Sequence, residues 1–99
     1  MSITAKEADN GQVLVIRVDG RFDYRANREF RTAMETGKPS RYVLDLTGAD
    51  YMDSSALGMM LILRDSVGGD GRRIKITGAN ASVRKILDVA RFGDIFDIE

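Results

Sequence analysis

The stretch Arg41-Tyr-Val-Leu-Asp-Leu-Thr47, followed after three residues by Tyr51-Met-Asp-Ser-Ser-Ala-Leu-Gly58, decides the fold of this chain. The first part has the apolar content of a buried strand, and the second has the polar residues that start a helix. In an open α/β sheet, ligands and partners gather beyond the carboxyl ends of the strands, where a helix N-terminus offers unpaired N–H groups and a positive dipole end. A serine in that place can hold a phosphoryl group.

The remaining elements predict an α/β fold around this unit. Residues 3–7 and 12–18 have the composition of a hairpin, with its turn at Asn10-Gly11. Helical spacing, caps and helix breakers then predict, in order, a helix over Tyr24–Thr36, a strand over Tyr42–Leu46, a loop over Thr47–Asp50, a helix from about Ser54 to Val67, a strand over Arg73–Thr77, a helix capped by Asn80 and a short strand over Ile95–Ile98. The order β-β-α-β-α-β-α-β predicts one mixed β-sheet with helices packed on it.

Length and composition exclude several classes of function. Ninety-nine residues make a single domain, 1–99, without room for a separate catalytic unit. The chain has 15 Lys and Arg against 15 Asp and Glu, so it lacks the basic excess that nucleic-acid binding requires. It has no cysteine and no histidine, which removes the thiol nucleophile, the histidine zinc site and the imidazole base. A histidine-dependent or cysteine-dependent enzyme is therefore excluded.

The ends and the apolar runs of the chain favour a cytoplasmic location. Residues 1–7 lack the basic start and the apolar run of a secretion signal. The longest apolar stretch, Met59–Leu63, is far too short to span a bilayer. We therefore expect a cytoplasmic protein with neither a membrane nor a nucleic acid as its partner.

The helix that follows the central strand starts with more polar groups than capping needs. Asp, Ser and Thr are preferred helix caps, and one of them is enough, so Asp53, Ser54 and Ser55 include a surplus. Asp23, at the end of the second strand, either caps the first helix or joins Asp53 in binding Mg²⁺ or orienting a hydroxyl. Gly58 inside the helix costs about 1 kcal/mol relative to alanine, which indicates tight packing or close approach by a partner.

The same helix has more apolar surface than one buried face requires. Leu57, Leu61 and Ile62 extend its apolar character around the side. Such residues belong either to the core or to an adaptable protein interface, and the sequence leaves both open. We take these three residues as the candidate partner-binding surface.

These motifs resemble the STAS domain of bacterial anti-sigma-factor antagonists over essentially the whole chain. In that family a strand leads into Asp-Ser-Ser-Gly-Leu-Gly, and a cognate kinase phosphorylates the serine directly before the small residue. The resemblance assigns phosphorylation to Ser55, with Ser54 as the alternative, and places Asp23, Asp53 and Gly58 around it. The matching segments are Gly20-Arg-Phe-Asp23, Val43-Leu-Asp-Leu46, Tyr51 to Gly58, Ile74-Lys-Ile76 and Val83-Arg-Lys-Ile-Leu87.

Two positions depart from the family pattern. Ala56 stands where the family usually has glycine, which is a mild change. Arg21-Phe22 replaces the usual acidic residue and leucine, and this alters the surface that a kinase would touch. The partner is therefore either an anti-sigma factor that is itself a serine kinase, or a small non-kinase one with a separate kinase.

The resemblance implies a non-enzymatic switch that binds an anti-sigma factor while Ser55 is free and releases it when Ser55 is phosphorylated by a serine kinase. A phosphatase would restore the free form. No cofactor is expected in this chain, because it lacks a Gly-rich phosphate loop with a following Lys, and ATP and Mg²⁺ belong to the kinase. The alternative is a constitutive scaffold or accessory subunit, such as the STAS-like component of a lipid-transport ATPase. A hydrolase with Ser55 as nucleophile ranks far behind, since no histidine can serve as its base.

Overall fold

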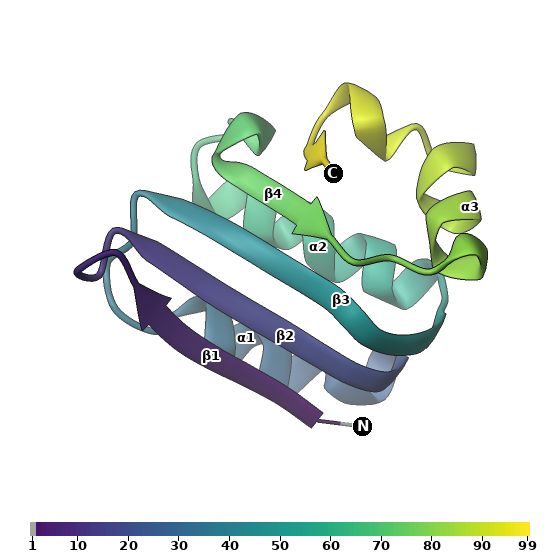
Figure 1. The fold of residues 1–99 in the computed structure, drawn as a ribbon, viewed down its shortest axis with the longest axis horizontal. Coiled ribbons are helices and arrows are strands. Elements are labelled where there is room, and N and C mark those ends of the chain that lie inside the picture. The colour runs from purple at the N-terminus through teal and green to yellow at the C-terminus, as the bar shows by residue number, and fades with distance from the viewer. Residues whose placement is uncertain (1) are drawn as a thin grey trace.

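A computed structural model describes residues 2–99, which form a five-stranded mixed sheet covered by helices (Figure 1). The strands lie in the order β1-β2-β3-β4-β5, with β1 antiparallel to β2 and each later neighbour parallel. They span Ser2–Ala8 (β1), Val13–Phe22 (β2), Arg41–Met52 (β3), Ile74–Thr77 (β4) and Asp97–Ile98 (β5). The predicted fold class, element order and hairpin are confirmed.

Three α-helices and three short 3₁₀ turns connect the strands. The α-helices span Asn27–Met34 (α1), Ser54–Ser66 (α2) and Ala81–Val89 (α3), and the 3₁₀ turns span Tyr24–Ala26 (η1), Gly71–Arg73 (η2) and Phe92–Asp94 (η3). Figure 1 shows α1 and α2 behind the sheet and α3 beyond the end of β4. The helix predicted over residues 24–36 is therefore divided, with η1 leading into a shorter α1.

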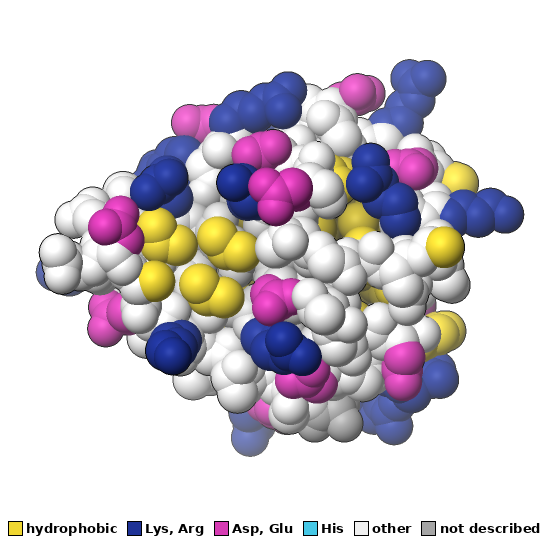
Figure 2. All heavy atoms as spheres, in the orientation of Figure 1, with side chains coloured by type: hydrophobic (Ala, Val, Ile, Leu, Met, Phe, Trp, Pro, Cys, Tyr) yellow, Lys and Arg dark blue, Asp and Glu magenta, His cyan; other side chains and the backbone are white. Residues whose placement is uncertain are grey.

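The core lies between the sheet and the helices because the central strands alternate in burial. The residues that face the helices are buried: Leu14, Ile16 and Val18 on β2, Leu44 and Leu46 on β3, and Ile74 and Ile76 on β4. The opposite face of the sheet is turned toward the viewer in Figure 2, where a small group of hydrophobic side chains lies among charged ones. Period-two alternation of this kind is what a sheet covered on one face requires.

The prediction of a loop over residues 47–50 is wrong, because β3 continues through these residues to Met52. The pairing of β3 with β2 shifts twice, between Arg17 and Asp19 and again between Gly20 and Arg21, so that β3 carries extra residues as bulges. At the first bulge the Asp45 carboxylate accepts hydrogen bonds from the backbone N–H of Thr47 (2.9 Å) and from its hydroxyl (2.6 Å). A polar bulged strand of this kind has the composition of a loop.

The C-terminal strand is shorter than predicted. Within residues 2–99 only Asp97–Ile98 pairs with β4, because the backbone N–H groups of Ile95 and Phe96 donate to the carbonyl oxygen of Phe92 in η3 (3.1 and 2.8 Å). The rings of Phe92 and Phe96 pack with their centroids 5.1 Å apart, and this contact holds the turn against the core.

Candidate functional site

The two longest parallel strands end level with each other, and each is followed by an aspartate that starts a helix. Phe22 on β2 pairs with Met52 on β3, so Asp23 and Asp53 follow on adjacent strands. Asp53 caps α2: its Oδ1 accepts hydrogen bonds from the backbone N–H groups of Ser55 (2.9 Å) and Ala56 (3.4 Å). The hydroxyl of Ser55 is therefore not used as the cap.

This division of roles predicts a difference in stability between two alanine variants. Asp53→Ala should lower the free energy of unfolding by about 0.5–2 kcal/mol, because it removes the cap. Ser55→Ala should lower it by less than about 1 kcal/mol, because the cap remains in place. Urea midpoints of the two variants and the unmodified protein make the comparison. A larger loss for Ser55→Ala than for Asp53→Ala would show that Ser55 is mainly structural.

The two serines open onto different hollows, which the sequence could not show. Half-buried Ser55 lines a hollow of about 280 Å³ between the η1–α1 segment and α2, together with Tyr24, Asn27, Gly58, Met59 and Ile62. Exposed Ser54 lies on the other side, in an apolar groove of about 440 Å³ between α2 and α3. A phosphoryl group would therefore meet different neighbours at the two positions.

Asp23 is a buried carboxylate held by two arginines. It is 4% exposed, and it caps η1 by accepting a hydrogen bond from the backbone N–H of Arg25 (3.1 Å). The Arg25 side chain donates to both Asp23 oxygens, at 3.1 and 2.7 Å, and Arg21 Nε lies 3.6 Å from Oδ2. The hydrogen bonds from the Arg25 side chain lower the pKa of Asp23 from 3.8 to about 2.

The carboxylates of Asp23 and Asp53 already have partners. Asp23 holds guanidinium groups, whereas Asp53 holds backbone N–H groups. In residues 2–99, no group of three or more Asp, Glu, His or Cys side chains is arranged to hold a metal ion. The arrangement therefore favours capping and charge pairing over the Mg²⁺ alternative for these two residues.

The pairing of Asp23 predicts a specific pH dependence of stability. Because its pKa is lower in the folded protein than in the unfolded chain, Asp23 stabilises the fold above about pH 4, and this contribution is lost as the pH falls toward 2. Asp23→Asn should therefore lose less stability than the unmodified protein between pH 4 and pH 2. Urea unfolding at pH 6, 4, 3 and 2 makes the comparison, and parallel curves over that interval would contradict the assignment.

The outer side of α2 carries an apolar surface beside the Ser55 hollow. Leu61 is 39% exposed and Ile62 40%, whereas Leu57 is half-buried and lines the groove on the Ser54 side. A methyl group at Gly58 would meet nothing within 4 Å outside the local helix backbone. Tight internal packing therefore does not explain this glycine, and the open space leaves room for a partner to approach the helix closely.

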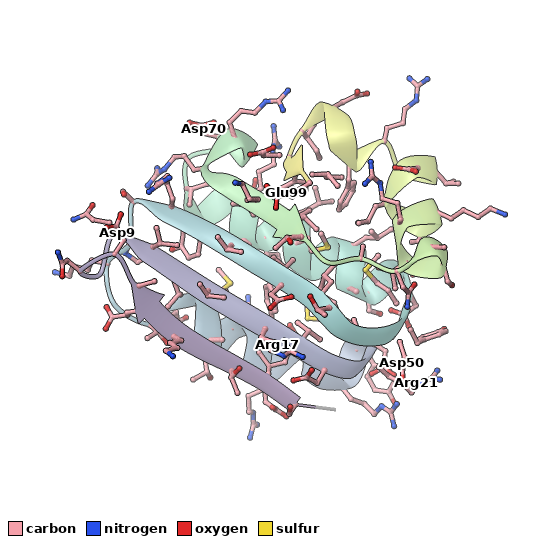
Figure 3. The ribbon with its side chains drawn as sticks, viewed as in Figure 1. Asp9, Arg17, Arg21, Asp50, Asp70 and Glu99 are labelled. Carbon is pink, nitrogen blue, oxygen red and sulfur yellow. The ribbon has the colours of Figure 1, made fainter. Side chains whose placement is uncertain are left out.

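Sequence reasoning named Arg21 only as a departure and missed Tyr24, Arg25 and Tyr51. Arg21 Cζ lies 3.9 Å from the centre of the Tyr51 ring, which it meets across the paired β2 and β3 strands. Figure 3 shows Arg21 at the end of the sheet where these strands stop, the same end as Asp50. The only signal in the sequence was that Arg21 lies near Asp23; its contact with Tyr51 depends on strand register.

Comparison with known proteins identifies the family. The family model described as Mlab, STAS domain matches residues 5–97. A STAS-domain containing protein of Pseudomonas aeruginosa (strain UCBPP-PA14) is 47% identical over 100 residues, covering 99% of both chains. An anti-sigma F factor antagonist of Paenibacillus polymyxa is 28% identical over 90 residues, covering 87% of this chain and 77% of its own length.

The fold is also that of solved antagonist structures. SpoIIAA, an anti-sigma factor antagonist, superposes in its unphosphorylated form with a TM-score of 0.69 at 21% identity, covering 88% of this chain and 82% of SpoIIAA. The phosphorylated form of the Bacillus protein gives a TM-score of 0.69 at 18% identity, covering 99% of this chain and 91% of that one. The family match spans nearly the whole chain, and the chain therefore belongs to the STAS domain family.

Proposed function

We propose that this protein is a non-enzymatic switch that binds an anti-sigma factor while Ser55 is free and releases it once Ser55 is phosphorylated. The observation that carries the proposal is the position of Ser55. Asp53 supplies the cap, which leaves the Ser55 hydroxyl uncommitted, and that residue shares a hollow with the exposed Ile62. Relatives named as anti-sigma factor antagonists support the kind of partner.

Release would follow from charge and desolvation. Phosphorylation adds about −1.5 to −2 charges and three acceptor oxygens. Ser55 lies beside Met59 and Ile62, so a phosphate there would have to lose water when a partner covers this surface. The carboxylate of Asp53 adds negative charge at the helix start, and an acidic partner surface would be repelled further.

A serine kinase and a phosphatase would act on this site, either as separate enzymes or with the anti-sigma factor as the kinase. In the kinase step the γ-phosphoryl group of ATP passes to Ser55 Oγ, the hydroxyl proton passes to a base of the kinase, and ADP leaves. ATP and Mg²⁺ belong to that enzyme. We infer that the switch acts in the cytoplasm, where these partners would meet it. No helix within residues 2–99 is long and apolar enough to cross a membrane.

Phosphopeptide mapping tests the assignment of the switch serine. After incubation with kinases from the source cell, the unmodified protein and Ser54→Ala should carry phosphate on Ser55, whereas Ser55→Ala should not be modified. Ser54→Ala is the matched control, because it removes the neighbouring hydroxyl and leaves the cap intact. A mark on Ser54 alone would move the site to the α2–α3 groove, and no mark with any kinase would contradict the switch.

A second candidate is a constitutive accessory subunit, for example of a lipid-transport ATPase, that docks through the same helix. The observation that favours it is the matching family model, whose description names Mlab and not an antagonist. This candidate requires α2 as a docking surface but no phosphorylation. A stable complex with a transport ATPase subunit that survives treatment with kinase and ATP would support it over the switch.

A further inference from the structure

Two arginines converge on Asp23 at the edge of the Ser55 hollow. The Arg25 side chain donates two hydrogen bonds to the Asp23 carboxylate, and Arg21 Nε lies 3.6 Å from it. Asp23 directly precedes Tyr24, which lines the hollow together with Ser55. More than half of each arginine side chain is exposed, so both guanidinium groups remain accessible from the solvent.

The backbone N–H groups at the start of α2 are already engaged. Those of Ser55 and Ala56 donate to the Asp53 carboxylate, and those of Ala56 and Leu57 also lie within hydrogen-bond distance of the Asp53 carbonyl oxygen. A phosphate on Ser55 would have to compete for these donors with a carboxylate of the same sign of charge. The helix terminus is therefore a poor binding site for this phosphate, and cationic side chains must supply the compensating charge.

Arg21 has the donors that such a phosphate needs. Its guanidinium lies over the Tyr51 ring at 3.9 Å, which orients the group. Within the described residues its side chain donates no hydrogen bond, and its ion pair with Asp23 is longer than a hydrogen bond. An arginine fork matches the geometry of a phosphate and can bind it through two N–H groups.

We propose that Arg21 and Arg25 form a clamp, held ready on Asp23 and Tyr51, that takes the phosphoryl group once Ser55 is modified. The inference rests on the proposed function, since it specifies how the switch serine is regulated. In the free protein both arginines are paired with Asp23. After phosphorylation Arg21 turns toward the phosphate, and Arg25 shares its N–H donors between Asp23 and the phosphate. This keeps the modified serine against its own domain and withdraws both cations from a partner.

The ionisation of the phosphate would report on the clamp directly. The second pKa of phosphoserine is about 6, and nearby cations lower it whereas nearby carboxylates raise it. Tyr24 lines the hollow itself. The other charged and titratable groups at this end of β2 and β3 are Arg21, Asp50 and Tyr51 on the strands, Asp23 and Arg25 at η1, and Asp53 before α2. Removing an arginine should therefore raise the pKa of the phosphate.

Phosphoserine incorporated at position 55 during synthesis allows a test by ³¹P NMR without any kinase. At low salt, Arg21→Gln and Arg25→Gln should each raise the second pKa of the phosphate by about 0.5. Arg28→Gln is the matched control, because Arg28 lies on α1 toward Ile3 and Ala5 of β1. It should change that pKa by less than about 0.1.

A second comparison separates a clamp from a general effect of charge. Phosphoserine placed at position 54 faces the α2–α3 groove, so its pKa should respond to Arg21→Gln by less than half as much. Equal responses at both positions, or an equal response to Arg28→Gln, would overturn the clamp. Arg21→Gln keeps the test decisive if Arg25→Gln unfolds the protein by leaving Asp23 without its closest partner.

The NMR titration tests the clamp and the phosphopeptide mapping tests the switch, so either hypothesis can fail without the other. If cells never phosphorylate Ser55, the proposed switch fails, while the NMR titration still shows whether the arginines bind a phosphate at that position. If Ser55 is phosphorylated but its pKa is the same in both arginine variants and the unmodified protein, the switch stands and the clamp is wrong.

Discussion

Ile62→Asp should weaken binding of the proposed anti-sigma factor partner by more than tenfold, which is more than about 1.4 kcal/mol, without unfolding the protein. Ile62 is 40% exposed on the outer side of α2 and lines the same hollow as Ser55. In the free protein the new carboxylate can reach water, so the fold tolerates it. In the complex it would be stranded in a desolvated apolar contact, where an unpaired charge is costly.

Calorimetry with a purified anti-sigma factor that binds the unmodified protein measures this loss. Thr4→Asp is the matched control, because it introduces the same charge at an exposed position on β1, paired with Arg17. It should leave the affinity within about twofold of the unmodified value. If Ile62→Asp is folded and binds as tightly as the control, α2 is not the partner surface.

Leu63→Ala, one residue further along the same helix, should act on folding stability and not on the binding surface. It should lower the free energy of unfolding by about 2–5 kcal/mol. Leu63 is 0% exposed and belongs to the hydrophobic core. Truncation removes its buried methyl groups and leaves a cavity that the close-packed surroundings fill only in part. A loss of this size is a large fraction of the stability of a domain of about 100 residues.

Urea unfolding followed by circular dichroism measures the effect, with Leu61→Ala as the matched control. Leu61 is 39% exposed on the same helix, so the same truncation there should cost about 1 kcal/mol or less. Similar losses for the two variants would contradict the division of α2 into a buried side and a partner-facing side. Together with Ile62→Asp, the pair assigns stability and binding to different sides of one helix.

Much of the fold could be read from the sequence because its signals are local. Apolar and β-branched content, with alternation over residues 73–77, indicated which segments become strands. Asp53 and Asn80 marked the helix starts because a cap bonds to N–H groups two or three residues away. The same local reasoning failed over residues 47–50. There the side chains have the composition of a loop, yet the backbone continues to pair with β2 through bulges.

The site itself depends on contacts between residues about thirty positions apart. By itself, the sequence determined the order of elements, the surplus hydroxyls at the start of α2 and the apolar excess on that helix. Tertiary structure alone decided that Phe22 lies opposite Met52, that Arg21 stacks on Tyr51 and that the two serines face different hollows. The physical reason is strand register, because two bulges in β3 set which residues meet across the strands. The positions of bulges depend on the packing of the whole sheet, and no short window of sequence contains that information.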